Sequence, residues 1–268
     1  MSAWTEPWVV QPEEVGLTAP DAPQCDVEHY GTTNSAVKLS LAERSALRTK
    51  GGMQQFRTVI NVRERMRHPA IPQFFGVILS PEDQNPCWLM IEKLDDAKSL
   101  SEWVRSSPLP DSSTILDVAK QLCLSLVFLH AQSIPHGNLS AANVLIGRGN
   151  DVKVSGIAEQ LLHYARAGSK PGPEQDIRAF GRILIQMCLG LTEEPTKNDY
   201  LQALKRFPSF SLILSTCLGP KETTAPEILS LIEKLIPHHT MGHLTNMDLR
   251  IPPSSSGEAP PLKRQREN

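Results

Sequence analysis

The sequence has almost no excess charge of either sign and few aromatic residues. Its 268 residues include 27 basic and 29 acidic side chains, which give a formal net charge of −2. This balance excludes proteins that bind nucleic acid through a strongly basic surface, and it excludes acidic solvating tails. Aromatic residues make up only 5% of the chain, but 40% of all residues are hydrophobic. That is enough apolar material to fold one large domain or two small ones without disulfide bonds.

Paired cysteines and export signals are missing as well. The five cysteines lie far apart and form no Cys-x-x-Cys motif, which favours reduced, mostly buried thiols in a cytosolic or nuclear protein. The N-terminus, MSAWTEPWVVQPEE, lacks the basic start and apolar run of a secretory signal. The longest segment without Lys, Arg, Asp or Glu, residues 121–147, contains two histidines, Pro135 and Gly137 and is a poor membrane span. We therefore expect a soluble protein that binds no membrane and no nucleic acid.

Composition divides the chain into three parts. Residues 1–29 form a predicted N-terminal extension with scattered prolines and two tryptophans, Trp4 and Trp8. We expect this extension to be partly ordered, with an ordered strand or a Trp-mediated docking segment as the alternative. Residues 30–240 form the predicted folded domain. Residues 241–268 end in PPSSSGEAPPLKRQREN, a composition that cannot bury enough apolar surface to fold, so a disordered tail is predicted.

The predicted domain changes from strands to helices along the chain. Short apolar runs predict strands at 35–39, 72–79 and 87–91, and a polar turn between the last two predicts a hairpin. Helical spacing of apolar residues predicts helices at 56–66, 113–132, 176–189, 200–207, 209–218 and 226–236. A second hairpin is predicted at 143–155. The predicted class is α+β, with a small strand-rich half before a helical half.

The order and spacing of several short motifs resemble the protein kinase family. Ala36-Val37-Lys38 resembles the family's Val-Ala-Ile-Lys strand, whose Lys holds ATP phosphates. Ile91-Glu92-Lys93-Leu94 resembles the gatekeeper and hinge, where adenine bonds to the backbone. The segment from His136 to Asn143 resembles the catalytic loop, and Asp176-Ile177-Arg178-Ala179-Phe180-Gly181 resembles the start of the central helix. The resemblance covers about residues 30–237 and implies a two-lobed kinase-like fold, with a small β-rich lobe and a helical lobe.

The resemblance also shows which groups phosphoryl transfer would lack. The catalytic Asp, which accepts the substrate hydroxyl proton, is replaced by Asn138, and an amide cannot act as that base. The metal-binding Asp of Asp-Phe-Gly is replaced by Gly156, which leaves Asn143 as the remaining Mg²⁺ ligand. The helix position that should offer a Glu to Lys38 is Val59. The segment from Ala158 to Asp176 is short and contains no Ala-Pro-Glu. We therefore expect no catalytic residue and no metal site.

Residues for a nucleotide site are only partly present. The resemblance assigns Lys38 to the phosphates, Ala36 and Leu145 to the two faces of adenine, and the hinge residues Glu92 and Leu94 to its edge. No Gly-x-Gly-x-x-Gly loop precedes Lys38. We therefore expect no cofactor. The alternative is ATP bound without a metal ion, in a site that also includes Asn143. Without a nucleotide, Lys38 is a strand lysine with another partner, and Ala36 and Leu145 are core residues.

The resemblance predicts a pseudokinase, meaning a kinase-like domain without catalysis. The His-Gly-Asn triplet at 136–138 is similar to that of the pseudokinase domains of Janus kinases. The expected role is a regulatory or scaffolding module in signalling that binds a protein partner, such as an active kinase or a signalling complex. One alternative is a kinase with weak ATP binding and residual Ser/Thr/Tyr phosphotransferase activity, and another is a degenerate paralogue with little function. The expected location is cytoplasmic, or nuclear if Lys263, Arg264 and Arg266 act as an import signal.

Overall fold

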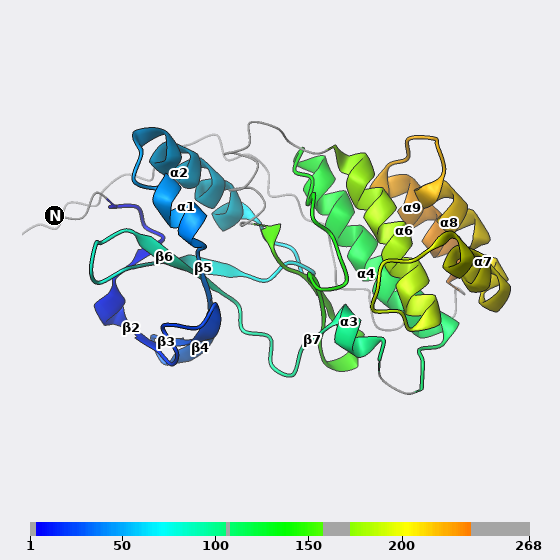
Figure 1. Cartoon of the computed structure of the whole chain (residues 1–268), viewed down its shortest axis with the longest axis horizontal. Helices are drawn as coiled ribbons and strands as arrows, with labels where there is room; N and C mark the ends of the chain where they lie inside the picture. The colour runs from blue at the N-terminus through cyan, green and yellow to red at the C-terminus, as the bar shows by residue number, and fades with distance from the viewer. Residues whose placement is uncertain (1–3, 106–107, 158–171, 237–268) are drawn as a thin grey trace, which may run out of the picture. The chain divides into compact units, whose positions relative to one another are not determined.

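The computed structural model describes residues 4–105, 108–157 and 172–236 (Figure 1). These residues form a mixed α+β domain with an N-terminal β-sheet and a helical C-terminal part, which confirms the predicted class. The predicted tail at 241–268, with Lys263, Arg264 and Arg266, lies outside the described residues, as does most of the segment from Ala158 to Asp176.

The N-terminal sheet has six strands in the order β1-β5-β6-β4-β3-β2. The strands are β1 (Val9–Val10), β2 (Val15–Leu17), β3 (Gln24–His29), β4 (Thr32–Lys38), β5 (Phe74–Leu79) and β6 (Pro86–Ile91). Neighbouring strands are antiparallel, except that β1 runs parallel to β5. The three predicted strands are confirmed as β4, β5 and β6 with small shifts at their ends, and β2 and β3 had no predicted counterpart.

Helix α2 (Lys50–Arg65) covers one face of this sheet, which we call the α2 face. Its buried residues Phe56 and Ile60 cluster with Leu89 of β6. Because side chains alternate along a strand, Trp88 and Met90 point to the opposite face, where they form a second apolar cluster. The helix begins at Lys50, earlier than the predicted start at 56, because the Thr49 hydroxyl caps it by accepting the Gly52 N–H at 3.0 Å. A short helix, α1 (Leu41–Ala46), precedes it.

The N-terminal segment is part of the sheet. The boundary predicted at residue 30 falls in the turn between β3 and β4, so it must be moved toward the N-terminus. Trp4 and Trp8 are both buried, and each meets Phe56 of α2 edge to face, with ring centroids 5.7 and 6.2 Å away. Trp8 Nε1 also donates to Asn61 Oδ1 at 2.9 Å. The segment therefore docks through its tryptophans, because the sheet and α2 offer an apolar surface that β1 completes.

The helical part contains α3 (Leu100–Trp103), α4 (Ser112–Ala131), α6 (Pro173–Leu189), α7 (Lys197–Arg206), α8 (Ser211–Leu218) and α9 (Ala225–Leu235). Helix α4 packs against both α6 and α9 around one apolar core (Figure 1). A three-stranded sheet in the order β7 (Lys98–Ser99), β8 (Val144–Ile146) and β9 (Val152–Val154) joins this part. The helices predicted after residue 99 and the hairpin at 143–155 are confirmed.

Helix α4 is long and apolar enough to meet a length-and-composition test for a membrane span. Half of its apolar stretch is buried inside the domain, where Leu122 and Leu126 belong to the core of the helical part. The core helix of a globular domain passes the same test.

All five cysteines are unpaired and buried, as the sequence predicted. Burial raises the pKa of the Cys188 and Cys217 thiols to about 12. Because the thiolate is the reactive form, these thiols are inert in the folded protein.

Candidate functional site

Asp176, in the first turn of α6, holds the segment that resembles the catalytic loop. Its side chain is 1% exposed, and its two oxygens accept the backbone N–H groups of His136 and Gly137, each at 2.7 Å. His130 Nε2 lies 2.8 Å from the same carboxylate. Gly137 has φ +74°, a conformation that glycine adopts without strain. The loop backbone is thus fixed by one buried carboxylate, which is an architectural role.

His136 is buried beneath this loop. Its Nε2 lies 2.9 Å from the carbonyl oxygen of Ser155, the residue before Gly156. Burial lowers the pKa of His136, against smaller opposing effects of the Ser155 carbonyl and the Asp176 carboxylate. His136 therefore ties the catalytic-loop segment to the segment after β9 and does not serve as an exposed acid or base.

The two asparagines of the loop are joined by a hydrogen bond from the side chain of Asn143 to the backbone of Asn138. Asn138 is exposed, and its carbonyl oxygen accepts Nδ2 of Asn143 at 2.7 Å. The carbonyl oxygen of Asn143 accepts the Ser155 N–H at 2.8 Å. Asn138 therefore presents only an amide to solvent at the position that the resemblance assigns to the catalytic base, and an amide takes up no proton near neutral pH.

Gly156 follows β9 in a left-handed conformation, with φ +84°. A Cβ added there would lie 3.5 Å from the Asn143 side chain, an ordinary contact distance. The next residue, Ile157, is buried with Met66, Leu129 and Ile134. The segment is therefore packed as a structural element, and at Gly156 itself the only oxygen is a carbonyl.

These residues do not fit a catalytic Mg²⁺ site. Mg²⁺ requires several oxygen ligands in near-octahedral geometry, usually including one or two carboxylates. Around Gly156 the chain offers the amide of Asn143, whose Nδ2 is bonded to Asn138. Within residues 4–105, 108–157 and 172–236, no group of three or more His, Cys, Asp or Glu side chains could hold a metal ion.

Lys38 and Ala36 lie on the sheet face opposite α2. Lys38 pairs with Trp88 across β4 and β6, and its Nζ is 5.6 Å from the centroid of the Trp88 ring. Its Nζ donates to the carbonyl oxygen of Pro20 at 2.7 Å. Ala36 is fully buried in the same apolar cluster as Trp88. On the α2 face the corresponding residue is Val37, which pairs with Leu89, and Val59 of α2 belongs to that cluster.

The remaining candidates form the link between the sheet and β9. Glu92 accepts the Gln73 N–H at 2.9 Å and is paired with Lys153 Nζ at 2.8 Å. The Leu94 carbonyl accepts the Ala97 N–H at 3.4 Å in a turn. Leu145 is half-buried in β8, where it pairs with Ser99 and Lys153. These residues are close to the expected hinge, where the Glu92 carboxylate and the Leu94 carbonyl are engaged with the protein itself.

Two further contacts near the hinge had no sequence signal. Lys93 Nζ is paired with Asp26 Oδ2 of β3 at 2.7 Å. Gln24 Nε2, also on β3, donates to Ser35 Oγ of β4 at 2.7 Å. No motif predicts these contacts, because Asp26 and Lys93 are 67 positions apart and meet only when the sheet forms.

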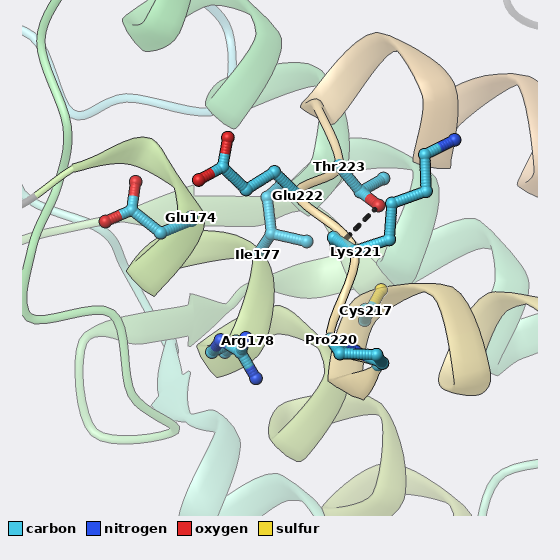
Figure 2. Close-up of a pocket in the computed structure, with 9 residues that line it drawn as sticks. Glu174, Ile177, Arg178, Cys217, Pro220, Lys221, Glu222 and Thr223 are labelled. Carbon is cyan, nitrogen blue, oxygen red and sulfur yellow. Dashed lines mark hydrogen bonds between the residues drawn. The ribbon is translucent and has the colours of Figure 1, made fainter.

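A cavity of about 150 Å³ lies between the start of α6 and the loop that joins α8 to α9. Figure 2 shows the residues that line it. The resemblance places here the ion pair between an Ala-Pro-Glu motif and an Arg. The loop instead carries Glu222, and Thr223 Oγ1 lies 3.5 Å from the Lys221 carbonyl oxygen. The lining residues are Glu174, Ile177, Arg178, Cys217, Gly219, Pro220, Lys221, Glu222 and Thr223.

Comparison with known proteins finds similarity to serine/threonine-protein kinases. The chain is similar to serine/threonine-protein kinase PLK4 of Drosophila simulans, with 22% identity over 228 residues, covering 77% of this chain and 28% of the relative. It is 22% identical over 177 residues to serine/threonine-protein kinase PLK4 of Nematostella vectensis, covering 59% of this chain and 18% of the relative. The PLK4 of Xenopus tropicalis matches at 22% over 207 residues, covering 66% and 21%. The chain thus spans less than a third of the length of these curated relatives.

The family assignment comes from a match to a protein-family model. A family model described as protein tyrosine and serine/threonine kinase matches residues 24–173, which is more than half of the chain. The matched region runs from β3 to the start of α6 and includes Lys38, the hinge, Asn138 and Gly156. This chain belongs to the protein tyrosine and serine/threonine kinase family.

Proposed function

We propose that this kinase-family domain is a pseudokinase that transfers no phosphate and acts as a regulatory or scaffolding module in signalling. The observation that carries the proposal is the catalytic-loop segment, which Asp176 holds rigidly while it presents Asn138 in place of a carboxylate. A kinase contributes positioning and charge stabilisation to the reaction, together with one proton acceptor. The chain keeps the positioning framework and lacks the acceptor.

The second chemical argument concerns the metal. Gly156 stands where the family's metal-binding carboxylate is expected, and the neighbouring Asn143 is bonded to Asn138. Without Mg²⁺, the negative charge that develops on the transferred phosphoryl group has no cation to stabilise it. Loss of the base and of the metal ligand together supports a role in binding.

The partner that this role implies is a protein, such as an active kinase or a signalling complex. The hydrogen bonds among Asp176, His136 and Ser155 hold the catalytic-loop segment in place without a catalytic group, which suits a recognition surface. The proposed location is the cytoplasm, or the nucleus if the basic C-terminal residues act as an import signal. A direct check is whether the purified domain changes the activity of a kinase that co-purifies with it in stoichiometric amount.

A phosphotransfer assay tests the loss of activity. Purified full-length chain is incubated with radiolabelled ATP, Mg²⁺ or Mn²⁺ and generic Ser/Thr and Tyr substrates. We expect no incorporation above a heat-denatured control, and none in the Asn138→Asp/Gly156→Asp double variant, because Lys38 faces away from α2. Incorporation by the natural chain that disappears in Lys38→Met would instead support the alternative of residual kinase activity.

A further inference from the structure

We infer that a polar bridge on the α2 face of the sheet takes the place of a nucleotide, so that the domain holds its folded state without ATP. The polar bridge consists of Gln24 and Asp26 on β3, Ser35 on β4 and Lys93 in the hinge. The inference rests on the proposed function, since a domain that transfers no phosphate needs no nucleotide substrate. It goes further by stating that nucleoside triphosphates of any kind find no site between β3, β4 and the hinge.

Strand register places the polar bridge where a nucleotide base would need apolar surface. Asp26 pairs with Ser35, and Ser35 pairs with Ile91, the residue before the hinge. Because Cys25 and Ala36 lie in the cluster opposite α2, Asp26 and Ser35 lie on the α2 face. A shift of one residue in a strand exchanges its two faces. The apolar Ala36 is therefore turned away, and the face that should hold the flat apolar ring of a base carries a carboxylate and a hydroxyl instead.

The groups of the polar bridge satisfy one another. Gln24 Nε2 donates to Ser35 Oγ at 2.7 Å, and Lys93 Nζ donates to Asp26 Oδ2 at the same distance. Ser35 is buried, and the hydrogen bond from Lys93 to Asp26 raises the pKa of Lys93. A base entering here would break these bonds and leave the Ser35 hydroxyl without its partner, which is unfavourable for a buried group.

The loop at the position of the family's phosphate-binding loop also uses polar groups for hydrogen bonds within the protein. Residues 18–23, between β2 and β3, read TAPDAP, and Pro20 and Pro23 have no N–H to donate. Ala22 N–H is bonded to the Ala19 carbonyl at 3.0 Å. Lys38 Nζ is bonded to the Pro20 carbonyl at 2.7 Å. Phosphate sites depend on backbone N–H groups and cations directed at the ligand, whereas this loop binds the protein's own lysine.

Calorimetric titration and thermal unfolding of the full chain with ATP, ADP and GTP, each with and without Mg²⁺, test the inference. We expect no saturable heat and no concentration-dependent rise in Tm at millimolar nucleotide. A saturable rise in Tm would overturn the inference. That result without phosphate transfer would leave the proposed function standing, so the two failures are distinguishable.

Variants test whether the polar bridge and Lys38 stabilise the nucleotide-free protein. Lys93→Met and Asp26→Asn should each lower Tm by about 1–3 °C without nucleotide, and the double variant should lower it no further, because both remove one half-exposed ion pair. Lys38→Met should also lower the Tm of the nucleotide-free protein. The matched control is Lys197→Met, an exposed lysine on α7. If all three variants match the control, or if Lys38→Met changes only a nucleotide response, the inference is wrong.

Discussion

At the scale of single residues, the family resemblance expects a carboxylate at two positions that lie in different surroundings, 138 and 156. Asn138 is exposed, so a carboxylate there would meet no obstacle. Gly156 leaves ordinary contact distance for a Cβ, although its φ of +84° favours glycine. Neither position is closed to Asp by lack of space. Lack of space for a side chain therefore does not explain the absence of these carboxylates.

Acid should weaken the domain through His136. Because burial lowers its pKa in the folded state, the unfolded chain binds the proton more readily. The contribution of His136 to stability is fully present above its unfolded pKa of about 6.5 and is lost as pH falls toward the folded value. Urea unfolding should give a lower midpoint at pH 5.5 than at pH 7.5.

The His136→Gln variant serves as the control for this acid effect. Its midpoint should fall less between the two pH values than that of the natural chain. A residual fall is expected from His68, whose pKa is also lowered, chiefly by burial. A midpoint that rises on acidification would contradict the interpretation of His136.

The residue scale also marks the limit of what the sequence could predict. Asn138 and Gly156 were found because long motifs fix their positions from both sides. Lys38 was placed in the correct strand, but its direction was not predictable from Ser35-Ala36-Val37-Lys38-Leu39, in which small and apolar residues occupy both faces. Only the pairing of Val37 with Leu89 decides that Lys38 faces away from α2.

At the scale of elements, the N-terminal segment stabilises α2. The Trp8→Ala variant should lower the free energy of unfolding by about 3–5 kcal/mol, since it empties a buried site beside Phe56. Trp8→Phe keeps an aromatic ring but loses the bond to Asn61, so a loss of about 1 kcal/mol is expected from the hydrogen bond alone. Chemical denaturation measures both values.

Tyr30→Ala provides the comparison for these variants, because Tyr30 is 82% exposed. Its effect should stay within about 0.5 kcal/mol. If Trp8→Ala behaved like Tyr30→Ala, the segment would not be docked on α2 in solution.

Elements differ in how well the sequence predicts them. Helix α4 was predicted almost to its ends, because nine of its residues are buried and repeat with helical spacing. Strand β1 contains two residues, Val9 and Val10, and has no period to detect. Its position depends on distant Gly76, where a Cβ would lie 2.8 Å from the Trp8 carbonyl oxygen. A pattern along the chain cannot report such a close approach between distant segments.

On the scale of the whole molecule, Glu92 and Lys153 connect the hinge to β9. Their side chains are 33% and 20% exposed, so solvent weakens the ion pair, and we expect a coupling energy of about 0.5–1 kcal/mol. A double-mutant cycle with Glu92→Gln and Lys153→Met, followed by urea unfolding, measures it. Strict additivity of the two single variants would show that the pair contributes nothing to the connection.

The parallel pairing of β1 with β5 has a consequence for synthesis of the chain. Val9 pairs with Val77, so β1 leaves the ribosome well before its partner strand, which follows almost seventy positions later. At a translation rate of roughly 5–20 residues per second, that delay lasts several seconds. Until residues 50–79 have been made, Trp4 and Trp8 do not have both α2 and β5 to cover them. The nascent chain therefore exposes two large apolar side chains until α2 and β5 have been made.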